Sequence, residues 1–251
     1  MIAYSTIDIE KTNFWLQKAI AYAREKENLD AEARCLARRG LIFSGMREKD
    51  SAAVYMDKAL KVIEGNYFFA TEKIAYEQYG LFLKRFGDYE NALNAYLKAL
   101  DANEKDKAKC IADNKEFHAN IYTNETSIRI NIANIHTTLL HYDKAIEQLL
   151  FTKKLIDENK HRISYLSAYE ILIAGNLAET YLTTFQYDKA FPFIQQYHEL
   201  AVASEDPAYM LSGLRRLSNY YRQTGDLEQA LDYAKQLLQL AEKNQQSCPY
   251  Q

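Results

Sequence analysis

The feature that most constrains this chain is a pair of small residues that recurs five times at a fixed separation. In each copy a Gly, Ala or Ser is followed by an alanine twelve residues later. The pairs are Gly40 and Ala52, Gly80 and Ala92, Ala133 and Ala145, Ala178 and Ala190, and Ser218 and Ala230. Two helices approach to about 8 Å only where both present small side chains at their crossing. The spacing therefore predicts five helix pairs, which must stack because one pair cannot bury its apolar surface alone.

The composition agrees with a chain made of helices. Among 251 residues there are only 8 Gly and 3 Pro, which leaves little material for the turns of a sheet protein. The helices that we predict are 10–28, 30–45, 48–64, 67–86, 88–112, 116–140, 143–159, 162–184, 187–204, 207–223 and 226–245. The charges of the segment 104–126 alternate in sign and it has no Pro or Gly, so we expect extra helix on both sides of its turn.

A second motif precedes the repeat alanines: a turn residue, an aromatic residue or leucine, and an acidic residue. It reads GDYENA from Gly87, HYDKA from His141, QYDKA from Gln186 and GDLEQA from Gly225. A Phe or Tyr also recurs three residues after the first small site, at Phe43, Tyr181 and Tyr221. With these residues the chain resembles the tetratricopeptide repeat family over residues 30–245. The Trp and the closing Pro of the family's signature are largely missing.

The resemblance implies one domain over residues 1–251, built as an all-α, right-handed solenoid of stacked antiparallel helix pairs with about 11 helices. In each repeat, helix A carries the first small residue and helix B carries the alanine. An unpaired helix is expected within 1–28, followed by repeats at 30–64, 67–112, 116–159, 162–204 and 207–245. Most of these repeats exceed the family's usual length of about 34 residues. In this they resemble bacterial regulators that sense short peptides (the Rap and PlcR type) and the arrays of MalT-like regulators.

Charge and cysteine content exclude several classes of function. The net charge is −3 and no Lys/Arg block is present, so nothing drives direct binding to nucleic acid. Cys35, Cys110 and Cys248 match neither a metal site nor a disulfide framework, which favours a reducing, cytoplasmic compartment. No stretch approaches the ~20 apolar residues of a membrane span. Without a phosphate loop or nucleophile elbow, the sequence predicts a protein that is not an enzyme and has no metal or cofactor.

Polar residues on the predicted A helices give the strongest functional signal. The A helices line the concave wall of such a solenoid, and asparagine is a poor residue in mid-helix. The resemblance implies that Asn pairs there with a peptide backbone, while Arg or Lys holds a carboxylate. The predicted groove consists of Lys84, Arg85, Asn131, Asn134, Asn176, Glu179, Arg215, Asn219 and Arg222, with Glu77, Thr137 and Arg216 beside them. The alternative is that these amides bond between helices or face water. The family's carboxylate clamp is not reproduced at matching positions.

The sequence therefore predicts a scaffold that binds a protein or peptide partner in the A-helix groove. The alternative is a ligand-sensing regulatory segment of a larger bacterial signalling or transcription regulator, which the unpaired first helix and the lack of a capping helix favour. Phe14, Trp15 and Tyr22 are candidates for self-association through the first helix, although packing on the first repeat is the simpler expectation. Tyr76 and Tyr220 are candidates for ligand stacking, with core packing as the favoured alternative.

Overall fold

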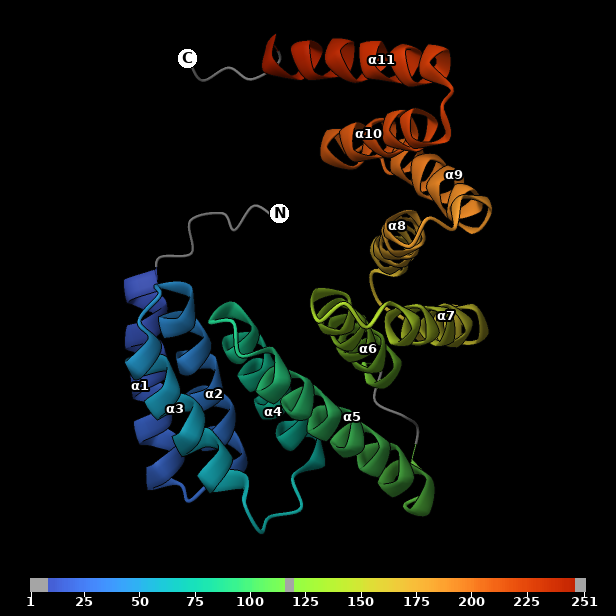
Figure 1. Ribbon diagram of the computed structural model, residues 1–251. Coiled ribbons are helices and arrows are strands. Elements are labelled where there is room, and N and C mark those ends of the chain that lie inside the picture. The colour runs from blue at the N-terminus through green and yellow to red at the C-terminus, as the bar shows by residue number, and fades with distance from the viewer. Residues whose placement is uncertain (1–8, 116–119, 247–251) are drawn as a thin grey trace. The chain divides into compact units, whose positions relative to one another are not determined.

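The computed structural model describes residues 9–115 and 120–246, which form eleven α-helices and one 3₁₀ helix (Figure 1). The chain divides into two compact units, Met1–Leu139 and Leu140–Gln251. Every predicted helix is present, with ends within five residues of the predicted ones. Cys248 and the predicted helical residues 116–119 lie outside the described residues.

The first unit contains the helices α1 (Ile9–Glu25), α2 (Leu29–Gly45), α3 (Lys49–Ile63), α4 (Phe69–Arg85), α5 (Tyr89–Ala112) and α6 (Ile121–Thr138). Helices α2 and α3 form one pair and α4 and α5 form the next (Figure 1). Helix α1 packs on α2, α2 packs on α4, and α5 packs on α6. Leu36 and Ile63 are central to one apolar core, and Met56, Tyr96 and Ile132 are central to the next.

The second unit contains α7 (Tyr142–Asn159), the 3₁₀ helix η1 (Lys160–Arg162), α8 (Leu166–Thr183), α9 (Tyr187–Ala203), α10 (Pro207–Thr224) and α11 (Leu227–Gln246). Helices α8 and α9 form one pair, α10 and α11 form another, and α9 packs on α10. Stacked rings join them, with the centroids of Phe191 and Tyr220 4.8 Å apart and those of Tyr221 and Tyr233 5.6 Å apart. The third predicted repeat is divided between the units, so its pairing of α6 with α7 stays a prediction.

The small residues of the repeat are buried, as predicted, except Ser218, which is half-buried. The five alanines are 0 to 7% exposed. A Cβ atom added at Gly80 would lie 3.0 Å from three ring carbons of Tyr96, and one added at Gly40 would lie 3.0 Å from Met56. In the last repeat, Ser218 Oγ donates a hydrogen bond of 2.9 Å to the carbonyl of Ala230. Each glycine thus receives the side chain four residues beyond the repeat alanine, one helical turn further on.

The turn inside each repeat uses one left-handed residue, five positions before the repeat alanine. These residues and their φ angles are Arg47 (63°), Gly87 (82°), Leu140 (61°), Phe185 (57°) and Gly225 (91°). Glycine adopts this conformation without the steric cost that a Cβ atom brings. Only two of the five are glycine, so the turn is identified by its place before the alanine rather than by residue type.

The region 104–126 is helical on both sides of its turn within the described residues, as predicted, because α5 continues to Ala112 and α6 begins at Ile121. A buried charge pair that the sequence analysis did not predict lies in this part of the unit. Lys73 of α4 and Asp106 of α5 are 4% and 6% exposed, and their Nζ and Oδ2 atoms are 4.0 Å apart. Burial lowers the pKa of Lys73, and the Asp106 carboxylate opposes that shift.

Replacing each of two repeat glycines by alanine should have different effects on stability. Gly80→Ala presses a methyl group onto the fully buried ring of Tyr96, and overpacking of this kind costs about 1–3 kcal/mol. Gly40→Ala meets the flexible chain of Met56, so the higher helix propensity of alanine should leave it neutral or more stable by up to about 1 kcal/mol. Urea unfolding followed by circular dichroism measures both. Equal free energies of unfolding for the two variants would contradict this contact model.

Removing one partner of the buried charge pair should be far more damaging than removing both. Asp106→Leu leaves the buried Lys73 ammonium without its main counter-charge, with only the weaker influence of Glu77, and such a loss costs about 3–5 kcal/mol. The double variant Lys73→Met/Asp106→Leu should recover most of that loss in the free energy of unfolding. The matched control is Asp157→Leu, which breaks the exposed 2.8 Å pair with Lys153 and should cost less than about 1 kcal/mol. A double variant no more stable than Asp106→Leu alone would show that the pair is not the source of the cost.

Candidate functional site

The nine predicted groove residues fall into two sets, one in each unit. Lys84, Arg85, Asn131 and Asn134 lie on α4 and α6, and we name this set the α4–α6 surface. Asn176, Glu179, Arg215, Asn219 and Arg222 lie on α8 and α10, and we name this set the α8–α10 surface. That the two sets form a single groove stays a prediction.

The α4–α6 surface is aligned by a hydrogen bond between its two helices. Ser127 Oγ of α6 donates to Glu77 Oε1 of α4 at 2.9 Å. Seven residues further along each helix come Lys84 and Asn134, about two turns beyond the hydrogen bond on the same side.

Lys84 is the cation of this surface that lacks a partner. Its side chain is half-buried, and it forms neither a salt bridge nor a hydrogen bond with any described residue. Burial lowers the pKa of Lys84, and no neighbouring carboxylate opposes the shift. Arg85 beside it is exposed and lies 3.5 Å from Ser44 Oγ of α2. A ligand carboxylate would therefore supply the charge that Lys84 lacks.

Glu77 and Asn131 form hydrogen bonds with other groups of the chain. The Glu77 carboxylate accepts from Ser127, and burial raises its pKa although that hydrogen bond acts in the opposite direction. Asn131 Nδ2 donates to the carbonyl of Ser127 in its own helix at 3.1 Å. For Glu77 the alternative is therefore observed, in which a groove residue bonds to a neighbouring helix. Asn131 bonds within its own helix.

On the α8–α10 surface, Glu179 is engaged between two helices. Arg216 Nη1 of α10 donates to Glu179 Oε2 of α8 at 2.7 Å, and the Arg216 guanidinium lies 4.9 Å from the ring centroid of Tyr197. A Cβ atom at Gly175 would lie 2.9 Å from Tyr197 and 3.3 Å from Arg216. Gly175 therefore makes room for both side chains. The sequence analysis missed this role, although a glycine in mid-helix was a usable signal.

The α10 part of this surface is a ladder of three polar side chains spaced four and three residues apart, on one helix face. Arg215 and Arg222 are exposed, and neither forms a salt bridge with a described residue. Arg222 Nη2 donates to Asn219 Oδ1 at 2.7 Å, which leaves the amide nitrogen of Asn219 as a donor. The ladder presents two positive charges and an oriented amide.

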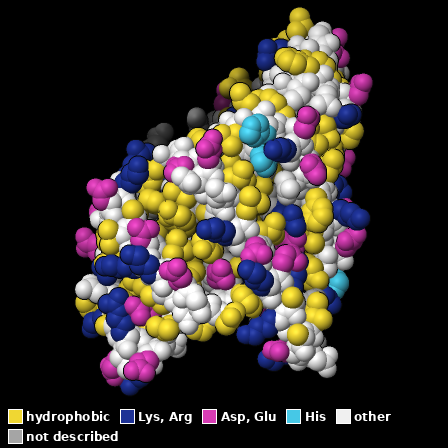
Figure 2. Space-filling model, turned by 60° about the horizontal axis from the view of Figure 1, so that its bottom comes forward, with side chains coloured by type: hydrophobic (Ala, Val, Ile, Leu, Met, Phe, Trp, Pro, Cys, Tyr) yellow, Lys and Arg dark blue, Asp and Glu magenta, His cyan; other side chains and the backbone are white. Residues whose placement is uncertain are grey.

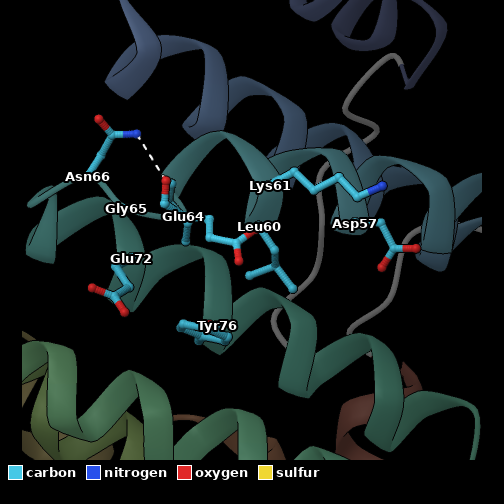
Figure 3. A pocket seen from close by; sticks show the side chains of 9 residues that line it. Asp57, Leu60, Lys61, Glu64, Gly65, Asn66, Glu72 and Tyr76 are labelled. Carbon is cyan, nitrogen blue, oxygen red and sulfur yellow. Dashed lines mark hydrogen bonds between the residues drawn. The ribbon is translucent and has the colours of Figure 1, made fainter.

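A pocket of about 480 Å³ lies between the end of α3, the following loop and the beginning of α4 (Figure 3). It is lined by Asp57, Leu60, Lys61, Ile63, Glu64, Gly65, Asn66, Glu72 and Tyr76. Tyr76 is the predicted ligand-stacking candidate that reaches a pocket, whereas Tyr220 packs against Phe191. The other lining residues were not predicted, because they meet only when α3 and α4 are packed together.

The aromatic residues of α1 do not pack on the first repeat, so the simpler expectation for them is wrong. Phe14, Trp15 and Tyr22 are 51%, 57% and 63% exposed. Lys18 Nζ lies 4.7 Å from the ring centroid of Phe14 and 5.6 Å from that of Trp15. Self-association through α1 stays a prediction, and the exposed rings are compatible with it.

Two further observations concern nucleic-acid and membrane binding. Basic and acidic side chains are interspersed among hydrophobic ones on the face shown in Figure 2. None of the helices in the described ranges is both long and apolar enough to cross a membrane. Among the described residues, no group of three His, Cys, Asp or Glu side chains has an arrangement that could hold a metal ion.

Comparison with known proteins places repeats of one family in both units. Residues 74–106 and 169–243 match models of the tetratricopeptide repeat. No curated protein sequence matches the chain.

Solved structures resemble the chain over most of its length. BtubC (BKLC) from P. vanneervenii has a TM-score of 0.76 at 14% identity, covering 97% of this chain and 94% of that one. A STAND protein with a tetratricopeptide repeat sensor, PH0952 from Pyrococcus horikoshii, has a TM-score of 0.73 at 18% identity, covering 90% of this chain and 33% of that one. The apo form of RapI has a TM-score of 0.59 at 14% identity, covering 93% and 99%. Two segments of the chain thus match the tetratricopeptide repeat, and its all-helical fold is that of a tetratricopeptide-repeat-like array.

Proposed function

We propose that the chain is a non-enzymatic scaffold that binds an acidic, extended segment of a partner protein or peptide on its A-helix surfaces. The observation on which this rests is Lys84, a half-buried cation with no partner among the described residues. A carboxylate from a ligand would compensate this partly desolvated cation. Proteins with tetratricopeptide repeats typically serve in protein interaction, which agrees with this proposal.

The α8–α10 surface supports the same class of ligand. Arg215 and Arg222 offer guanidinium groups, which match carboxylates in a planar, bidentate geometry. The Asn219 amide, held by Arg222, can bond the backbone of an extended peptide whatever its sequence. These polar contacts would set orientation, with affinity concentrated in a few anchors.

A second candidate is a regulatory segment that senses a ligand within a larger protein. It is favoured by the similarity to the STAND protein with a repeat sensor, of which this chain spans about one third. In such a role, ligand binding would act by favouring one of two arrangements of the repeats. Domains joined to this chain in its full reading frame would separate the two candidates.

Charge reversal on α10 should weaken binding of acidic peptides. Linear peptides selected by phage display on the wild-type protein provide the probes, and we expect them to be rich in Asp and Glu. For Arg215→Glu/Arg222→Glu we expect about a tenfold higher dissociation constant at low salt, because two attractive pairs become repulsive. Isothermal titration calorimetry measures it. Lys84→Met should weaken the same peptides if they also reach the α4–α6 surface.

The matched control is Lys144→Glu/Lys235→Glu, which makes the same change in net charge at exposed positions on α7 and α11. It should leave the dissociation constant almost unchanged. If the control raises the dissociation constant equally, the effect comes from overall charge and not from the α8–α10 surface. If phage display selects no acidic peptides, the proposal is rejected.

A further inference from the structure

The pocket between α3 and α4 has two ends of different charge. At one end Lys61 extends toward Asp57 (Figure 3), so that end is close to neutral. At the other end lie the carboxylates of Glu64 and Glu72. Neither forms a salt bridge or a side-chain hydrogen bond with another described residue. This end therefore carries two carboxylates that lack a salt bridge, and Lys98 and Lys105 are the nearby cations that act on Glu72.

The two glutamates and the ring of Tyr76 line the same pocket (Figure 3). Burial raises the pKa of the Tyr76 hydroxyl, the charges of Glu72 and then Glu64 raise it further, and Lys105 opposes them. Burial also raises the pKa of Glu72, an effect that Lys105 and Lys98 oppose and Asp101 reinforces. Glu72 is thus partly desolvated, and the nearby lysines do not cancel the cost.

The walls of the pocket suit the aliphatic part of a basic side chain. Leu60 and Ile63 contribute apolar surface, and the Tyr76 ring forms part of the wall. Lys98 Nζ already lies 5.2 Å from the centroid of that ring, so the ring is placed to interact with cations. Gly65, which also lines the pocket, has no atom within 4 Å of an added Cβ, so the space beside it is open. Long basic side chains bury their methylene groups against such surface while the charged end is paired.

We propose that this pocket binds a lysine or arginine side chain of a partner polypeptide, with its cationic group between Glu64 and Glu72 and its methylene groups along Leu60 and Tyr76. The inference rests on the proposed scaffold function and adds a second site of opposite charge preference. Partners would be segments in which basic residues are accessible, in contrast to the acidic segments expected at the α4–α6 and α8–α10 surfaces.

The test uses fluorescein-labelled Gly-Ser peptides containing either four lysines or four arginines, with anisotropy measured at low salt. At least one should bind the wild-type chain, and Glu64→Gln/Glu72→Gln should weaken that binding about tenfold, since each exposed charge pair contributes a few-fold. Tyr76→Leu should weaken it with no change in net charge. A Gly-Ser peptide without basic residues should not bind. Circular dichroism shows whether each variant keeps its helical content.

The matched control is Glu90→Gln/Glu147→Gln, which removes two exposed carboxylates on α5 and α7 outside the pocket. It should leave peptide binding almost unchanged. Equal weakening of peptide binding by this control would overturn the proposal. The proposal would also be overturned if free spermidine bound as tightly as the peptides, because the pocket would then take small amines instead of a partner's side chain. If the wild-type chain binds the acidic peptides but neither basic peptide, this site is rejected and the proposed function is not. If the wild-type chain binds a basic peptide but no acidic peptide, the proposed function is rejected.

Discussion

The structure depends on one repeated contact, in which a small residue of one helix lies under a large side chain of its partner. Gly80 lies under Tyr96, Gly40 lies under Met56, and a third glycine, Gly175, lies under Tyr197. Without a Cβ atom at these places the two backbones approach closely, and the large side chain fixes the register along the helix. Because the contact recurs, the same face of each A helix is buried in its own pair while another face is left for neighbours or ligands.

Much of the fold could be predicted from the sequence because this contact is local. The small residue and its alanine are only twelve positions apart, so Gly80 and Ala92 report a helix crossing without knowledge of the rest of the chain. The predicted helix positions followed from that spacing. What the sequence analysis missed depends on partners distant in sequence: Lys73 and Asp106 are 33 positions apart, and Glu179 and Arg216 are 37. Neither pairing has a sequence period to reveal it.

The candidate site was predicted in part for the same reason. Position within a helix identified Lys84, Arg215 and Arg222 as residues of the A-helix surfaces. Position alone could not show that Glu77 bonds Ser127 or that Glu179 bonds Arg216, because each depends on the alignment of two A helices. The pocket at Tyr76 needs a loop and two helices together, so a sequence pattern could identify the tyrosine as a candidate but not its setting.

Helix α4 shows why Lys84 stands out among the charged residues of the first unit. Lys73, Glu77, Gly80 and Lys84 form one stripe, because positions four, seven and eleven residues apart share a helix face. Along it, Lys73 has Asp106, Glu77 has Ser127, and Gly80 receives the Tyr96 ring. Lys84 alone has no counterpart among the described residues, yet burial has already lowered its pKa. Desolvating a cation without a partner costs stability. A ligand that brings a carboxylate to this position would complete the stripe.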